Sequence, residues 1–124
     1  MVKEPVESSP YLPLFYADKK KFSFISQCAF YSELFLSMWK TKDEKFLICD
    51  STMFSNLVFA ELLKLENMMT DEEVELTYKV ADAHMKLIPE LDIHIVLVRN
   101  EDSLFDNVRK RSRTLEKGQF EYLK

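Results

Sequence analysis

The stretch Phe46-Leu47-Ile48-Cys49-Asp50 decides how this chain is interpreted. It is almost wholly apolar, it follows the charged residues 42–45, and a Ser-Thr pair comes directly after it. A short apolar run with polar boundaries, placed between helical patterns, predicts a β-strand that is buried on both faces. The run ends in a carboxylate, and ligands of open α/β sheets bind just beyond the carboxyl ends of the strands. Asp50 is therefore a candidate site residue, with capping of a helix that begins near Met53 as the alternative.

The rest of the chain alternates between helical patterns and one further strand pattern. Residues 93–98 are mostly β-branched and predict a second strand. Thr70-Asp71-Glu72-Glu73 is a capping box that starts a helix ending at Pro89. Helices between strands imply right-handed crossovers, so the predicted class is α/β, with parallel strands at about 46–50 and 93–98 packed by long helices. Further predicted helices cover 22–40, 53–68 and 101–111, the last capped by Asn100, with a helical turn near 11–16.

Composition excludes several classes of partner. The 124 residues carry a formal charge of −4, which argues against a nucleic-acid polymer or an anionic membrane as the main partner. No apolar run approaches the roughly 18 to 20 residues that span a bilayer, and the N-terminus does not resemble a signal peptide. We therefore expect a cytoplasmic protein that forms a single domain over residues 1–124, with Cys28 and Cys49 as free thiols.

The glycine count limits what chemistry the chain can perform. Gly118 is the only glycine, whereas ordinary usage of about 7% would place several in a chain of this length. Neither of the glycine-rich loops that hold phosphates, GxxxxGK[ST] or GxGxxG, is present. If the protein handles a nucleoside triphosphate, the part that holds the phosphates is not in this sequence.

Three other features each allow two interpretations. The basic cluster over residues 109–113 either balances the dipole at a helix C-terminus or forms a lid over phosphates, with Gly118 just beyond it. Gln27 either lies on the surface or, if buried, needs partners for its amide, which the edge of a nucleobase would supply. His84 has no His or Cys at ligand spacing, so a structural histidine is favoured over a metal ligand.

Three stretches resemble the deoxynucleoside kinase family, which contains the deoxyadenosine, deoxyguanosine and deoxycytidine kinases. They occur along this chain in the same order as in the family. The second stretch is Ile48-Cys49-Asp50-Ser51-Thr52, where the family carries an acid, an arginine and a serine at a strand end. The third is Arg111-Ser112-Arg113 with Glu116 and then 121–123, which is similar to the family's lid. The first and most specific stretch comprises Glu4-Pro5-Val6, Ser9-Pro10-Tyr11-Leu12, Phe15-Tyr16-Ala17-Asp18, Phe22-Ser23-Phe24 and Gln27.

The resemblance implies a partial P-loop-kinase-like fold, with the family's phosphate-loop segment before Met1 and its last strand and helix after Lys124. The family transfers the γ-phosphoryl group of ATP to the 5′-hydroxyl of a deoxynucleoside, so the resemblance implies ATP and Mg²⁺ as cofactors. The residues of this sequence that match the family's functional residues are Glu4 as general base, Tyr16 and Glu116 at the sugar 3′-hydroxyl, Gln27 at the base, Phe22 lining the base pocket, Asp50 at the strand end, and Arg111 and Arg113 as lid arginines.

The chain departs from the family pattern at four positions. Ser51 stands where the family has an arginine, Leu34 and Asn56 stand where an Arg and an Asp frame the base, and Asn107 replaces an arginine of the lid helix. We therefore expect this chain alone to bind neither ATP nor Mg²⁺ and to be inactive as a kinase by itself. It is either a divergent kinase whose phosphate loop lies elsewhere, or a catalytically dead protein that binds nucleosides or a subunit. The broad apolar surface of 53–68 predicts a homodimer or heterodimer formed through helices.

Overall fold

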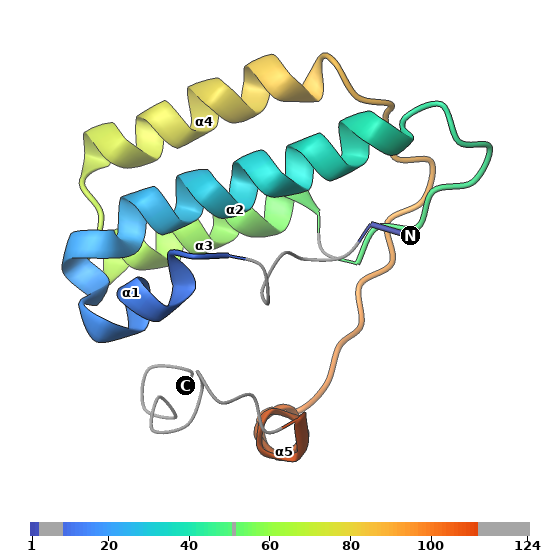
Figure 1. Ribbon diagram of the computed structural model, residues 1–124. Helices are drawn as coiled ribbons and strands as arrows, with labels where there is room; N and C mark the ends of the chain where they lie inside the picture. Colours follow the sequence, from blue (N-terminus) through green and yellow to red (C-terminus); the bar gives the residue numbers. More distant parts are fainter. Residues whose placement is uncertain (3–8, 51, 112–124) are drawn as a thin grey trace. The chain divides into compact units, whose positions relative to one another are not determined.

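The computed structural model describes residues 1–2, 9–50 and 52–111, with only the backbone for Glu101 and Arg111. The chain divides into two compact units, Met1–Glu90 and Leu91–Lys124. The helices in the described residues are α1 (Leu12–Ala17), α2 (Lys19–Thr41), α3 (Met53–Leu65), α4 (Asp71–Met85) and α5 (Glu101–Arg111) (Figure 1). The helices predicted from the sequence are thus confirmed, with ends that differ by a few residues.

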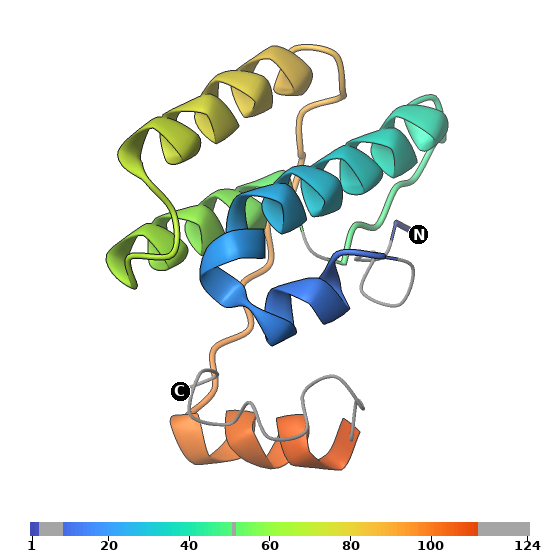
Figure 2. The same cartoon turned by 60° about the vertical axis from the view of Figure 1, so that its left-hand side comes forward.

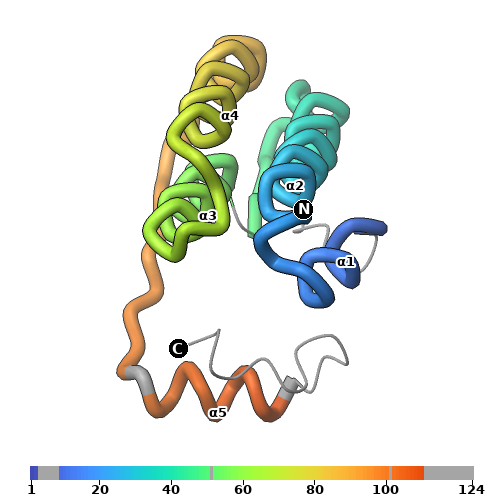
Figure 3. The backbone as a smooth tube through the Cα atoms, turned by 90° about the vertical axis from the view of Figure 1, so that its left-hand side faces the viewer, coloured from blue at the N-terminus to red at the C-terminus, as the bar shows by residue number. Residues whose placement is uncertain are grey.

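The first unit is a helical bundle. Figure 3 looks along it and shows α2, α3 and α4 as three neighbouring helices, with α1 beside α2. Figures 1 and 2 both show α1 next to the first turns of α2. Two small residues, Ala60 of α3 and Ala81 of α4, have no exposed surface and allow the helices to pack closely. The core cluster contains Val2, Tyr31, Leu34, Met38, Met53, Leu57 and Ala81.

The connection between α3 and α4 follows from local chemistry. Asn67 has a φ of 56°, in the left-handed region that Asn tolerates better than most residues. Its N–H donates to Lys64 O (2.9 Å) and the Met68 N–H donates to Leu63 O (2.8 Å), which is the bonding pattern of a Schellman motif. This motif ends α3 at Leu65, whereas the sequence pattern extends to Met68.

The capping box at the start of α4 is confirmed. The Glu73 N–H donates to Thr70 Oγ1 (3.2 Å), and the Thr70 N–H donates to Glu73 Oε2 (2.8 Å). The acidic side chains in the first turn of α4 stabilise the helix, because their negative charge interacts favourably with the positive end of the helix dipole. In the second unit, the Ser103 N–H donates to Asn100 Oδ1 (2.9 Å), so Asn100 caps α5 as predicted.

The predicted strands are not formed over the described residues. The run 46–50 contributes one isolated parallel bridge, between Val2 and Cys49, in which the Val2 N–H donates to Ile48 O (2.8 Å) and the Asp50 N–H donates to Val2 O (2.9 Å). Phe46 is 84% exposed and Ile48 is 68% exposed, so the predicted burial of this run on both faces does not hold in this structure. A strand is buried only where neighbouring strands and covering helices pack on it, and Val2 is the one neighbour described. The parallel strands stay a prediction.

The second predicted strand, 93–98, belongs to the second unit and is extended chain without a ladder partner among the described residues. Its apolar side chains are exposed, from 70% for Val96 to 88% for Val98.

In α5, Phe105 and Val108 are half-buried, but Leu104 is 50% exposed. Within the described parts of the chain, no helix is long and apolar enough to cross a membrane. That residues 1–124 form one domain stays a prediction.

Candidate functional site

The corner between α1 and α2 carries three of the predicted site residues. Asp18 forms the corner: its N–H donates to Leu14 O (3.0 Å), and its Oδ1 accepts from the Lys21 N–H (3.1 Å), which caps α2. Tyr16 lies in the last turn of α1, before the corner, and Phe22 lies in the first turn of α2, after it. Gln27 lies further along α2, about one and a half turns after Phe22. The structure thus places these three residues on two helices that meet at Asp18.

Gln27 lies on the inward side of α2. Ser23, four residues earlier, and Tyr31, four residues later, are both buried, and residues four apart share a helix face. The Gln27 Oε1 atom is buried and has no hydrogen-bond partner. An unpaired buried acceptor costs about 1–3 kcal/mol, so such groups ordinarily find a partner. Of the two interpretations of Gln27, the structure supports the buried amide whose oxygen requires a donor.

The two aromatic rings of the corner are partly buried. The Tyr16 ring lies 5.5 Å from the ring of Phe15, at an angle of 56°, and Phe15 is buried. The Lys21 ammonium lies 5.3 Å from the centre of the Phe22 ring. Each ring is only partly buried, so part of its surface stays exposed to solvent.

Asp50 is exposed at the end of the run 46–50. It does not cap α3, because Thr52 occupies the N-cap position, with φ −122° and ψ 166°. The Thr52 side chain makes no capping hydrogen bond, and its Oγ1 is buried without a partner. The capping interpretation of Asp50 is therefore wrong, and its role as a site residue stays a prediction.

Two buried hydroxyls, those of Ser9 and Thr52, are not among the site residues predicted from the sequence. Ser9 is 6% exposed and its Oγ has no hydrogen-bond partner, and the Thr52 hydroxyl is in the same situation. Both residues lie in stretches that resemble the family, but nothing in a single sequence distinguishes a buried serine from an exposed one.

The remaining predicted site residues are not positioned by the structure. Glu4, Arg113 and Glu116 lie outside the described residues. Arg111 is the last residue of α5, and only its backbone is described.

The positions that depart from the family pattern lie in the helical bundle. Leu34 has no exposed surface and belongs to the core cluster, and Asn56 is 5% exposed. At position 34, where the family carries an arginine, this chain therefore uses the side chain for core packing, and a guanidinium there would lose its hydration.

The titratable side chains inside the bundle serve packing. The His84 ring stacks on Phe35 with a centroid distance of 3.9 Å and on Tyr31 at 5.6 Å, as expected of a structural histidine.

Both cysteines, Cys28 and Cys49, are free. Burial raises the pKa of the Cys28 thiol, and the nearby Glu73 carboxylate raises it further. Burial also raises the pKa of the Cys49 thiol. Neither thiol has the lowered pKa that is typical of a nucleophile.

Among the residues that the structure describes, no group of three or more His, Cys, Asp or Glu side chains could hold a metal ion. The sequence has no glycine loop for the phosphates, because Gly118 is its only glycine.

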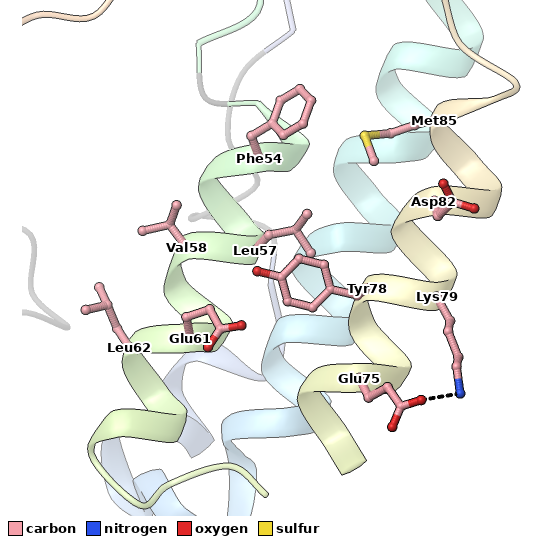
Figure 4. Close-up of a pocket in the computed structure, with 10 residues that line it drawn as sticks. All are labelled: Phe54, Leu57, Val58, Glu61, Leu62, Glu75, Tyr78, Lys79, Asp82 and Met85. Carbon is pink, nitrogen blue, oxygen red and sulfur yellow. Dashed lines mark ion pairs between the residues drawn. The ribbon is translucent and has the colours of Figure 1, made fainter. Parts of the chain in front are cut away.

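A second surface feature is an apolar groove between α3 and α4, with a volume of about 850 Å³ (Figure 4). Glu61 and Tyr78 lie across it from each other, and the pKa of the Tyr78 hydroxyl is raised by partial burial and by its hydrogen bond to Glu61. The Lys64 Nζ to Asp71 Oδ1 ion pair (2.9 Å) also joins the two helices. The groove is lined by Phe54, Leu57, Val58, Glu61, Leu62, Glu75, Tyr78, Lys79, Asp82 and Met85.

Comparison with known proteins gives a consistent set of relatives. A deoxyguanosine kinase of Lactobacillus acidophilus is 29% identical over 120 residues, which cover 91% of this chain and 52% of that protein. The deoxyguanosine kinase of Lactobacillus johnsonii is 28% identical over 120 residues, covering 91% and 53%. That of Dictyostelium discoideum is 24% identical over 120 residues, covering 93% and 42%. The chain spans about half the length of these relatives, and no solved structure matches it.

The family model described as deoxynucleoside kinase matches residues 1–124. Because this match covers the whole sequence, the chain belongs to the deoxynucleoside kinase family, whose fold is P-loop-kinase-like.

Proposed function

We propose that this chain provides the nucleoside-binding part of a deoxynucleoside kinase, the enzyme class that transfers a phosphoryl group from ATP to the 5′-hydroxyl of a deoxynucleoside. The observation that carries this proposal is the buried, unpartnered Oε1 of Gln27. Family membership supports it, and so does the position of Tyr16, Phe22 and Gln27 on two helices that meet at Asp18. By itself the chain binds the nucleoside without turnover, because the phosphate-holding loop is not in this sequence.

Each proposed role follows from the chemistry of the side chain. A primary amide both donates and accepts, so Gln27 can pair with the edge of a base, while the Phe22 ring packs on its face. Tyr16 and Glu116 hold the sugar 3′-hydroxyl, Glu4 is the general base at the 5′-hydroxyl, and Asp50 contributes to substrate binding at the carboxyl end of the predicted strand 46–50. Arg111 and Arg113 add positive charge near the phosphates, which phosphoryl transfer requires more than covalent catalysis.

We propose that the protein is cytoplasmic, as expected from its sequence. We also propose that residues 1–124 are one incomplete domain, with the phosphate-binding segment supplied by a longer chain or by a partner.

Calorimetric titration of the 124-residue chain tests the proposal. Deoxyadenosine, deoxyguanosine, deoxycytidine and thymidine are titrated one at a time, and ATP is titrated separately. We expect saturable binding of at least one nucleoside and none of ATP. If no nucleoside binds to a chain that shows a cooperative thermal melt, the nucleoside-binding proposal fails.

Gln27→Leu tests the observation that carries the proposal. It removes the amide but keeps most of the side-chain volume, so we expect at least about a tenfold loss of nucleoside affinity. Because it also removes an unpaired buried acceptor, thermal stability should stay the same or rise. Ser32→Ala, on the exposed side of the same helix, is the matched control and should leave affinity unchanged. Unchanged affinity in Gln27→Leu would contradict the role of Gln27.

The groove between α3 and α4 favours a second function, binding of another subunit. On α3, Phe54 is 50% exposed, Val58 60% and Leu62 49%, which is an unusual apolar row for an outer helix face. This row is part of the broad apolar surface of residues 53–68 from which the sequence predicts a dimer.

We propose a second copy of this chain as the partner, and the charges on α4 support this. Glu75, Lys79, Asp82 and Lys86 share one face of the helix and alternate in sign, with ion pairs between Glu75 and Lys79 and between Asp82 and Lys86 (both 2.6 Å). In an antiparallel two-fold pairing centred between 79 and 82, Glu75 faces Lys86 and Lys79 faces Asp82 of the second copy. The face is therefore complementary to itself, as a two-fold interface requires.

Analytical ultracentrifugation tests this dimer. We expect Lys79→Glu to weaken it, because like charges then face each other, and we expect Lys79→Glu combined with Asp82→Lys to restore it. Val58→Asp should weaken it by placing a charge in the apolar row. A monomeric wild-type chain at all concentrations, or a dimer that is insensitive to these substitutions, would rule out this interface.

A further inference from the structure

One side-chain hydrogen bond joins the start of α1, which is the end of that helix away from Asp18, to α2. Ser26 is 3% exposed, and its Oγ donates to the main-chain oxygen of Tyr11 at 3.2 Å. Tyr11 is the residue directly before α1, and Ser26 is the residue directly before Gln27. The bond therefore connects the start of α1 to the turn of α2 that carries Gln27.

Helix α1 depends on such contacts for its position. It has six residues, and isolated helices of that length are not stable in water. At its C-terminal end it is held by the Asp18 corner, and along its length by burial of Phe15, which is 6% exposed. The Ser26–Tyr11 bond holds the other end, so that α1 cannot pivot about Asp18 without breaking it.

We propose that Ser26 is a positioning residue of the nucleoside site, which through Tyr11 holds α1, and with it Tyr16, in a fixed place relative to Gln27. This inference rests on the proposed function, in which Tyr16 contacts the sugar 3′-hydroxyl and Gln27 contacts the base. Without the bond, α1 moves more freely, and the sugar contact weakens while the base contact persists. Ser26 then determines how strongly the site discriminates between nucleosides with and without a 3′-hydroxyl.

The test compares two ligands and three variants of the full 124-residue chain. The ligands are a deoxynucleoside that binds the wild type and its 2′,3′-dideoxy analogue, and the measured quantity is the ratio of their affinities. In Ser26→Ala we expect this ratio to fall about fivefold, through weaker binding of the deoxynucleoside, since a hydrogen bond of ordinary strength is lost. The dideoxy analogue should bind Ser26→Ala and the wild type equally well.

Ser23 offers a matched control on the same helix. It has no exposed surface, and its Oγ donates to the main-chain oxygen of Lys19, within α2. Ser23→Ala therefore also removes a buried hydroxyl and its bond, but that bond lies within α2 and does not involve α1, so the affinity ratio should not change. Ser26→Thr keeps the hydroxyl and should restore most of the ratio.

Hydrogen exchange gives a readout that needs no nucleoside. The Phe15 N–H donates to Tyr11 O (2.8 Å) and the Asp18 N–H donates to Leu14 O (3.0 Å), so these two amides report on α1. Their exchange should accelerate in Ser26→Ala and not in Ser23→Ala. Unchanged exchange rates in Ser26→Ala would overturn the proposal, whatever the measured affinity ratio. Faster exchange combined with an unchanged affinity ratio would overturn it as well. Absence of nucleoside binding by the wild type identifies a failure of the proposed function instead, and Ser26 then has no site to position.

Discussion

Replacement of Leu34 by alanine tests whether α2 packs against α3 and α4 as described. Leu34 has no exposed surface, and the core cluster around it draws on all three helices, with Tyr31, Met53 and Ala81 among its members. Neighbours held by three helices cannot collapse fully into the space that the substitution leaves. The cost therefore includes both lost transfer free energy and a cavity, and we expect the free energy of unfolding to fall by about 3 kcal/mol.

Leu36 provides the comparison. It lies two residues further along α2 and is 49% exposed, so its truncation removes only part of a buried surface and leaves no closed cavity. Alanine also has the higher helix propensity, and we expect Leu36→Ala to cost less than about 1 kcal/mol. Urea unfolding followed by circular dichroism at 222 nm measures both variants. Equal costs for Leu34→Ala and Leu36→Ala would refute the packing of α2 derived above.

Leu34→Arg extends the test to the position where the family carries an arginine. A guanidinium at a site without exposed surface loses its hydration, and no partner carboxylate belongs to the core cluster. We expect this variant to be less stable than Leu34→Ala. A variant as stable as the wild type would mean that position 34 can open to solvent.

Three further predictions concern single side chains of the bundle. Thr70→Ala removes the hydroxyl that accepts from the Glu73 N–H and should lower the free energy of unfolding by about 1 kcal/mol in urea titrations, whereas Thr70→Ser should retain most of it. Burial raises the pKa of Tyr31 to about 12 from 10.0, so the stability that depends on its neutral form is present below pH 10 and is lost as the pH rises through 12. At pH 11 the expected loss is about 1.4 kcal/mol relative to pH 9, and a Tyr31→Phe variant with the same decline would contradict it. His84→Phe keeps the stacking on Phe35 and removes a buried Nδ1 without a partner, so its melting temperature should equal or exceed that of the wild type, while a clear decrease would show that Nδ1 has a partner.

The features predicted correctly from the sequence are those that depend on neighbouring residues. The capping box of α4 needs only Thr70 and Glu73, and the cap of α5 needs only Asn100 and Ser103. Both pairs lie three residues apart, so the sequence itself brings the groups together. Amphipathic spacing located the helices for the same reason, although the end of α3 was set by the left-handed conformation of Asn67.

The predicted strands show what a single sequence does not determine. A strand buried on both faces needs neighbours from distant parts of a chain, and the run 46–50 has only Val2 beside it in the described residues. The exposed Phe46 and Ile48 have apolar surface that such neighbours would cover. The family match over residues 1–124 supports a P-loop-kinase-like fold, while the parallel strands predicted from local pattern stay unconfirmed.

Residue types at fixed spacing were sufficient to predict the helices, the caps of α4 and α5, the absence of a glycine loop and the resemblance to deoxynucleoside kinases. Packing in three dimensions was needed to show that the Gln27 oxygen is buried without a partner, that Leu34 belongs to the core, and that Ser26 bonds to Tyr11, fifteen residues away. Burial and long-range hydrogen bonds arise when separate helices pack on one another. They depend on which faces meet, and that information is distributed over the whole chain.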